Sequence, residues 1–218
     1  MKLRSMKPLE RQTALLLLLA AAFNGFIQSF SQTQDIIARK ALHAADWQIL
    51  AMTLIWPLSN LMSIWMGRIF EKSCHKSRYF IAAGVFGRLT LGWGLFLAGV
   101  NEYLILLMLL YSANSILIPA QNSIFQKNID GSRRAKVYGY TISLSMLVSI
   151  CITFVAGRVL DSHEQSFRWI MLGTGIAGFI SCLVLSRVKQ PEPCASTEKI
   201  PFRKALTEPL TRSVELLK

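Results

Sequence analysis

Polar side chains recur inside the long apolar stretches of this chain, at spacings that could form a binding site. In residues 12–34, Asn24, Gln28 and Gln32 follow one another at four-residue steps, which places them on one face of an α-helix. Carboxamide groups both donate and accept hydrogen bonds, so such a face could bind a polar solute. The same groups could instead bond to a neighbouring helix, and for Asn24 and Gln28 the spacing leaves both interpretations open.

Two other stretches carry further candidates for contact with a solute. Tyr111, Asn114 and Gln121 lie within residues 103–126. Arg88 is the only charged residue in the stretch 79–100, about ten residues from its start, so a helical rise of about 1.5 Å per residue places it roughly 15 Å deep. An arginine at this depth in a membrane faces inward, toward a carbonyl group, an acid or an anionic substrate. A structural partner is favoured here over a substrate, and both stay open.

A regular series of hydroxyl side chains follows in residues 137–157. Thr141, Ser145, Ser149 and Thr153 recur at intervals of four and so share one helix face. Small hydroxyls in membrane helices commonly hydrogen-bond to a neighbouring helix. This series therefore favours helix packing over solute binding.

Small residues predict close packing in two further stretches. Gly173, Ala177 and Ser181 recur at four-residue steps within residues 169–186, and Gly84 and Gly87 lie together within residues 79–100. Small side chains allow the backbones of two helices to approach. We therefore expect both stretches to have a structural role.

These residues belong to a chain whose charges are segregated. Apolar residues make up 52% of the 218 residues and charged residues only 17%, with a formal net charge of +12. The charges gather between six apolar stretches, each of about the 20 residues that a helix needs to cross a bilayer. The stretches are 12–34, 47–67, 79–100, 103–126, 137–157 and 169–186. Continuous rather than alternating apolarity excludes a β-barrel, so the sequence predicts an all-α integral membrane protein with six transmembrane helices.

Basic residues alternate between the two ends of these predicted spans. They cluster before the first span, in the loops after the second and fourth spans, and after the sixth. Because cytoplasmic loops carry the excess of Lys and Arg, we expect both termini to be cytoplasmic in a multi-pass protein of the plasma membrane, the inner membrane of a bacterium. We expect a cytoplasmic N-terminus (1–11), a six-span bundle (12–186), and a cytoplasmic linker with an amphipathic segment (187–218). The first stretch is too long for a signal peptide and is interpreted as an uncleaved helix.

Several functional classes lack support in the sequence. The three histidines and four cysteines show no metal-ligand spacing, and the chain has neither a GxxxxGKS/T phosphate loop nor a GxSxG nucleophile motif. We therefore expect no enzyme activity, no cofactor and no metal ion. Cytoplasmic loops account for the basic charge without a nucleic acid as partner.

The loop after the second span carries a charged motif. Residues 67–78 read GRIFEKSCHKSR. This stretch resembles the signature between the second and third spans of the major facilitator superfamily of secondary transporters, which is roughly G-x-x-x-D-R/K-x-G-R-R/K. Gly67, Lys72 and Lys76 match it, Glu71 stands where aspartate is usual, and the two residues before Lys76 depart from it.

A second loop resembles the same family. Residues 132–139 read SRRAKVYG, similar to the family's R-G-R-x-x-G, and Pro119 lies where the family has a proline late in the fourth span. In the family these loops hold the cytoplasmic face closed in one of two alternating states. The gate residues that the resemblance implies are Gly67, Glu71, Lys72, Lys76, Arg134 and Gly139.

A glycine-to-acid spacing occurs twice. The second span ends in GRIFE, Gly67 to Glu71, and the fifth ends in GRVLD, Gly157 to Asp161. If the chain consists of two three-helix repeats, these two spans are equivalent. Because three is an odd number, the repeats are then inverted in the membrane, as in many transporters.

The resemblance implies a secondary active transporter, a permease that moves a small solute by alternating access. In the family the first, second, fourth and fifth spans line the pathway, and the third and sixth lie outside it. Six spans form one half of such a carrier. We therefore expect a second six-helix half, in the same gene or on a separate chain, as a partner beside the lipid bilayer and a small-molecule substrate. The alternative is a truncated or non-transporting six-span membrane scaffold.

Overall fold

The part of the chain that the structure describes is built from helices. The computed structural model describes residues 6–72 and 76–189, and no strand occurs within these ranges. The side chains of Glu71, Lys72 and Lys76 lie outside the described part, so it includes only Gly67, Arg134 and Gly139 of the predicted gate. The segment beyond residue 189, with most of the predicted linker and the amphipathic segment, also lies outside it.

The helices follow one another with short connections. The first three spans contain α1 (Pro8–Ile36) with a π-helical turn (Ile37–Ala41), α2 (Asp46–Lys72), and α3 (Lys76–Ala83) with a π-helical turn (Gly84–Arg88) and a 3-10 segment (Leu89–Phe96). The last three contain α4 (Val100–Asn128), α5 (Gly131–Ser162), a 3-10 turn (Glu164–Ser166) and α6 (Phe167–Ser186). We refer to α3 with its two continuations as the third span.

Within the described residues, six helical segments are long and apolar enough to cross a membrane, as the sequence predicted. Most extend beyond the predicted stretches: residues 137–157, for example, form the middle of α5 (Gly131–Ser162). The reason is that a stretch without charges gives only the length of helix that can lie in the hydrocarbon core. Beyond it, the helix can continue into water with charged residues. On α2, Leu50, Leu54, Leu58 and Leu61 are exposed. Such an apolar face fits contact with lipid.

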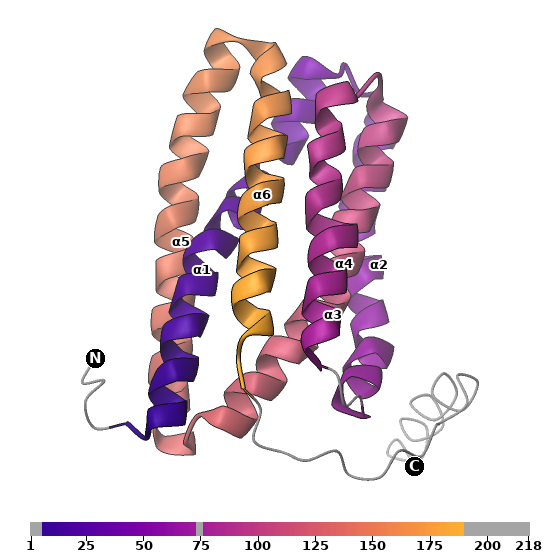
Figure 1. Ribbon diagram of the computed structural model, residues 1–218. Coiled ribbons are helices and arrows are strands. Elements are labelled where there is room, and N and C mark those ends of the chain that lie inside the picture. Colours follow the sequence, from indigo (N-terminus) through magenta and orange to yellow (C-terminus); the bar gives the residue numbers. More distant parts are fainter. Residues whose placement is uncertain (1–5, 73–75, 190–218) are drawn as a thin grey trace, which may run out of the picture.

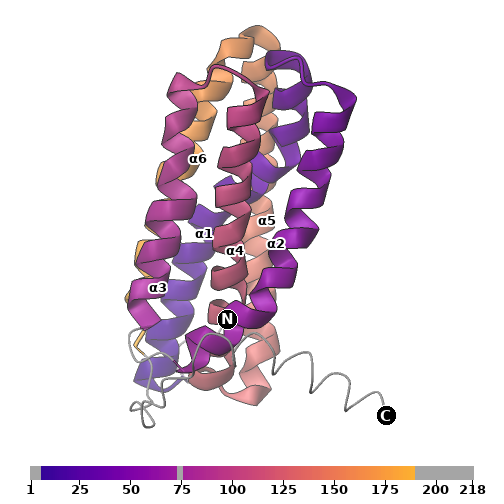
Figure 2. The same cartoon turned by 90° about the vertical axis from the view of Figure 1, so that its right-hand side faces the viewer.

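The helices stand side by side, and each contacts particular neighbours (Figure 1). α1 packs along α5 and α6, whereas α4 packs along α2 and the third span. The third span and α6 also pack on one another, and they join the two groups (Figure 2). α1 begins and α6 ends at the lower end of Figure 1, where α4 also connects to α5. We refer to this as the lower end and to the opposite one as the upper end.

The third span is not the continuous α-helix that its apolar run of residues 79–100 predicts. It changes to a π-helical turn at Gly84, changes again after Arg88, and ends at Phe96. Gly87 lies so close to α4 that a Cβ atom added to it would come within 2.1 Å of the Cβ of Ala113. Irregular turns inside helices often mark strain or function, and here the irregularity coincides with this close contact and with Arg88.

Close contacts between helices use some of the predicted small residues and not others. Gly84 and Gly87 pack closely, as predicted, whereas Gly173 has no atom of another element within 4 Å of its added Cβ position. Gly175 and Gly178 approach the third span and α1 instead: a Cβ on Gly175 would lie 2.8 Å from the carbonyl oxygen of Arg88. Ala177 and Ser181 of the predicted series are buried, and the Ser181 hydroxyl donates to the backbone oxygen of Ala20 at 2.9 Å, so the predicted face of α6 is buried at two of its three residues and does meet α1.

Candidate functional site: a polar cavity between three helices

A cavity of about 330 Å³ lies between α1, α4 and α5. Its polar side chains are four carboxamides and three hydroxyls, and Phe125 adds an aromatic ring. The carboxamides are Asn24, Gln28, Gln121 and Asn122, and the hydroxyls are Thr141, Ser145 and that of Tyr138. Among the described residues that line it, none is Asp, Glu, Lys, Arg or His. The cavity therefore combines polar and apolar groups without a formal charge.

α1 reaches the cavity through a close contact with α5. A Cβ atom on Gly25 would lie 2.8 Å from the carbonyl oxygen of Ser145, so the two helices touch at this level. The neighbouring Gln28 accepts a hydrogen bond from the Ser145 hydroxyl at 3.0 Å. One turn earlier, Asn24 makes no side-chain hydrogen bond within the described residues. The close approach at Gly25 thus lets Gln28 bond to α5, whereas the Asn24 carboxamide stays available at the cavity wall.

α4 supplies Gln121 and Asn122 just after a proline inside the helix. Pro119 packs against α2, where a Cβ added to Gly67 would lie 3.2 Å from the proline Cβ. Proline lacks a backbone N–H, so the helix loses one backbone hydrogen bond in the turn before the cavity. Within the described part of the chain, neither Gln121 nor Asn122 makes a side-chain hydrogen bond. Their donors and acceptors remain available to a solute.

Arg88 lies outside this cavity, in a closed contact between the third span, α4 and α6. Only 2% of its surface is exposed. Its Nη2 atom donates a hydrogen bond to Oδ1 of Asn114 at 2.7 Å, whereas its Nε and Nη1 atoms have no hydrogen-bond partner among the described residues. A Cβ atom on Gly178 would lie 3.1 Å from the Arg88 Cδ, so a glycine of α6 makes room for the side chain. The arginine thus has the structural partner that its sequence position favoured.

Tyr111 also forms a contact between helices rather than lining the cavity. Its hydroxyl donates to Oε1 of Gln34 at 2.7 Å and lies 3.2 Å from the Ser31 hydroxyl, which joins α4 to α1. Tyr103 donates to the backbone oxygen of Gln34 at 3.2 Å, one further bond between the same helices. These bonds fix the upper halves of α1 and α4 against each other.

The seven candidate solute-binding residues therefore divide into three groups. Asn24, Gln28 and Gln121 come together at the cavity. Arg88, Asn114 and Tyr111 lie in bonded contacts between helices. Gln32 is exposed and does not line the cavity.

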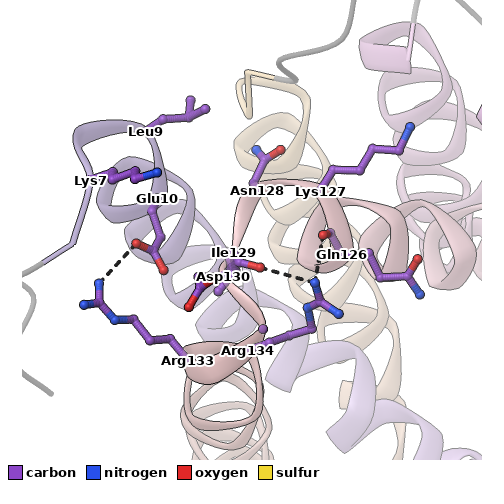
Figure 3. Close-up of a pocket in the computed structure, with 11 residues that line it drawn as sticks. Lys7, Leu9, Glu10, Gln126, Lys127, Asn128, Ile129, Asp130, Arg133 and Arg134 are labelled. Atoms are coloured by element: carbon purple, nitrogen blue, oxygen red, sulfur yellow. Dashed lines mark hydrogen bonds and ion pairs between the residues drawn. The ribbon is translucent and has the colours of Figure 1, made fainter.

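The lower end carries a second, charged hollow of about 600 Å³, between the start of α1 and the connection from α4 to α5 (Figure 3). Arg133 forms an ion pair with the buried Glu10 at 3.3 Å. Arg134 donates to the backbone oxygen of Gln126 at 2.9 Å and so satisfies a carbonyl at the end of α4. In the short connection, the Ser132 hydroxyl donates to Asp130 and lowers the pKa of that carboxyl below its usual value.

The three described members of the predicted gate have separate surroundings. Gly67 contacts Pro119 of α4, and Arg134 bonds to the end of α4. Within the part of the chain that the structure describes, no atom of another element lies within 4 Å of the added Cβ position of Gly139. At the upper end, Asp161 of the GRVLD sequence forms an ion pair with Lys40 at 2.9 Å.

Some residues of the cavity were not singled out from the sequence. Tyr138 and Phe125 form an edge-to-face pair with ring centroids 5.4 Å apart and supply its aromatic wall. Tyr138 lies beside the basic loop in the sequence, outside the regular hydroxyl series. Its distance of three residues from Thr141 and seven from Ser145 was the available signal, because that spacing places all three on one helix face.

Two of the four hydroxyls in the series of α5, those of Ser145 and Thr153, bond to α1, as the spacing favoured. Besides the bond from Ser145 to Gln28, the Thr153 hydroxyl donates to the Ser29 hydroxyl at 2.9 Å. Thr141 instead donates to the backbone of Val137 within α5. Ser145 thus serves both packing and the cavity wall.

Comparison with known proteins adds no relative. No family model, no curated protein and no solved structure matches this chain. Across the described residues, no group of three or more His, Cys, Asp or Glu side chains could hold a metal ion.

Proposed function

We propose that this chain is a six-helix bundle of a secondary active transporter, similar to one half of a major facilitator superfamily permease, and that it moves a small solute by alternating access. The observation that carries the proposal is the cavity between α1, α4 and α5. Three carboxamides chosen from the sequence alone, Asn24, Gln28 and Gln121, line it together.

The cavity has the size and chemistry that a solute site needs. Its volume of about 330 Å³ is near the lower end of the roughly 300–1,000 Å³ that ligand pockets occupy. Polar groups inside a membrane bundle are costly unless they are bonded or face a polar occupant. Asn24 and Gln121 are partly buried and make no such bond within the described residues, which favours a polar occupant, whereas Asn122 is exposed.

The packing of the helices supports an inverted repeat. If the first three spans are exchanged with the last three, α1 corresponds to α4, α2 to α5, and the third span to α6. The contacts of α1 with α5 and α6 then correspond to those of α4 with α2 and the third span. The exchange leaves the contact between the third span and α6 unchanged. Two inverted three-helix repeats would give this agreement between the contacts of the first three spans and those of the last three.

The charge distribution supports a cytoplasmic lower end. Lys7, Lys127, Arg133 and Arg134 gather around the charged hollow there. At the upper end, Lys40 is paired with Asp161. An excess of basic residues favours the cytoplasmic side, so we propose that both termini are cytoplasmic in a plasma membrane. We further propose that a second six-helix bundle, on the same or another chain, completes the pathway.

Solute flux tests this function. The full chain is reconstituted into proteoliposomes, and uptake of labelled sugars, nucleosides, amino acids and carboxylates is measured with empty liposomes as background. We expect saturable uptake of at least one solute that Gln121→Leu reduces at least tenfold. The matched control is Gln32→Leu, the same substitution at an exposed position outside the cavity, and it should retain uptake.

The alternative scaffold predicts a different result. If no solute enters above background, alone or with a second bundle supplied by co-expression, transport by this chain is excluded. Uptake that is equally insensitive to Gln121→Leu and Gln32→Leu would remove the cavity from the pathway.

A further inference from the structure

We infer that the cavity between α1, α4 and α5 selects uncharged solutes rich in hydrogen-bonding groups and excludes organic anions and cations of the same size; this deepens, and rests on, the proposed transport function. The groups that line the cavity and the position of the buried Arg88 outside it determine this chemical class of solute.

The lining offers both donors and acceptors without a net charge. Each carboxamide carries an acceptor oxygen and two N–H donors, and each hydroxyl can do both. The Gln28 oxygen already accepts from Ser145, so its NH₂ group is the part left for a solute. Asn24 and Gln121 have all their bonding capacity available within the described residues. Neutral hydroxyl or amide groups, which donate and accept in the same way, complement this set.

An ion would lack compensation in this cavity. Removing an ion from water costs several kcal/mol even after the protein relaxes, and an opposite charge with good geometry is what offsets the cost. The described residues that line the cavity supply no such charge. Arg134 lines the adjoining hollow, and its guanidinium donates to the backbone oxygen of Gln126 at the end of α4. Dipoles of uncharged carboxamides can solvate a neutral polar group, but they do not replace a counterion.

The buried charge of the third span is held away from the cavity. Arg88 donates to Asn114, is 2% exposed, and does not line the cavity. A Cβ atom on Gly178 would lie 3.1 Å from the Arg88 Cδ, so α6 packs against this side chain. A carboxylate solute in the cavity would therefore not meet the arginine.

One wall of the cavity is apolar and aromatic. Phe125 is almost fully buried and packs edge-to-face on Tyr138, whereas Leu17 and Ala20 belong to the buried core beside them. A solute with polar groups along one side and C–H groups along the other fits a site of this composition. Small neutral sugars and neutral aromatic amides are members of that class.

Matched sets of probes test the selectivity on the full chain in detergent. The first set is D-glucose, D-glucuronate and D-glucosamine; the second is nicotinamide, nicotinate and 3-(aminomethyl)pyridine. Each set contains a neutral, an anionic and a cationic compound of related shape, and the increase of the melting temperature reports binding. We expect the neutral member of at least one set to raise the melting temperature and its charged relatives to leave it unchanged.

Two results would overturn the inference. One is a charged member that stabilises the chain as strongly as its neutral relative. The other is the absence of a shift with the neutral members of both sets at concentrations up to the solubility limit.

Variants that introduce a charge give a second, independent measurement. Gln121→Glu should make the cavity bind the cationic member of the responding set at least about tenfold more tightly, and Gln121→Lys should do the same for the anionic member, because each supplies the missing counterion. Gln32→Glu and Gln32→Lys are the matched controls outside the cavity and should leave the selectivity unchanged. Equal effects at the two positions contradict the inference.

Failure of selectivity and failure of transport give different results. Binding of the neutral probes without flux in proteoliposomes would remove the transport function and leave the selectivity of the site intact. Flux of a charged member with exclusion of its neutral relative would leave transport intact and contradict the selectivity.

Discussion

Two polar regions inside this bundle, the uncharged cavity and the contact around Arg88, share the helix α4 and differ in how their polar groups are used. Asn114 accepts a hydrogen bond from the buried guanidinium of Arg88, and Gly178 of α6 lies next to the arginine side chain. Gln121, two helical turns later, lines an open space and has no partner within the described residues. The comparison separates polar groups that hold helices together from polar groups that remain available to a solute.

Removing the acceptor of Arg88 should have the largest effect on stability. Asn114→Leu leaves a buried charge without its hydrogen bond, and we expect a loss of about 3 kcal/mol in the free energy of unfolding. Reversible unfolding in mixed detergent measures it. Asn122→Leu, the same change on the same helix at the cavity, should cost less than about 1 kcal/mol.

The double variant sharpens this prediction. Replacing Arg88 and Asn114 together by leucine removes both the charge and its partner, so the stability should recover most of the loss. If Asn114→Leu and Asn122→Leu cost the same, the distinction between the two polar regions is wrong.

The close contact that shuts the Arg88 region is tested by Gly87→Ala. The added methyl group would lie 2.1 Å from the Cβ of Ala113, so the third span and α4 must separate. We expect a loss of about 1–3 kcal/mol, measured by the same unfolding assay. Gly139→Ala is the control, because its Cβ position is open and an alanine favours the helix by about 0.5–1 kcal/mol. Equal stability of the two variants would contradict the close packing of Gly87 against Ala113.

The hydrogen bond between Ser145 and the Gln28 carboxamide should contribute less to stability than the contacts around Arg88. Ser145→Ala removes the hydrogen bond to Gln28, and such bonds between membrane helices contribute about 0.6 kcal/mol on average. We expect a stability loss of this order together with altered solute affinity, since the Gln28 oxygen becomes available. A loss as large as that of Asn114→Leu would show that Ser145 serves packing alone.

The ion pair of Lys40 and Asp161 should contribute least. Both side chains are more than half exposed at the upper end, so water screens their attraction. Asp161→Asn should lower stability less than any of the variants above, and the difference should decrease in 1 M salt. Exchanging the two residues, Lys40→Asp with Asp161→Lys, should restore the wild-type value. A salt-insensitive loss would mean that Asp161 acts through another contact.

The sequence predicted the six helices because lipid imposes a length and a composition that are visible as charge-free stretches. It did not predict which candidate residues would meet. An α-helix turns about 100° per residue, so each four-residue step drifts by about 40°. Asn24 and Gln28 reach the cavity, whereas Gln32, one step further, is exposed. The neighbour that a face meets depends on packing between distant helices, which spacing within one helix does not contain.

The break in the third span could not be predicted for the same reason. Its apolar run suits a continuous helix, and the glycines that it contains are common in membrane helices. Gly87 matters for the break because it lies against Ala113 of α4, which is 26 residues later in the sequence. Arg88 was correctly placed inside the bundle, but its partner Asn114 had been a separate candidate for solute contact.

Accessibility of single cysteines to a membrane-impermeant maleimide distinguishes a solute-accessible cavity from the closed region around Arg88. Two chains are reconstituted in liposomes: one keeps only the native Cys182, which is 1% exposed beside Arg88, and the other carries only Gln121→Cys. The reagent is added to both faces of the membrane, and labelling in SDS confirms that each thiol is reactive. We predict labelling of the cysteine at position 121 and none of Cys182 in the folded chain. Protection of both positions, or equal labelling of both, would contradict a solute-accessible cavity distinct from the closed Arg88 region.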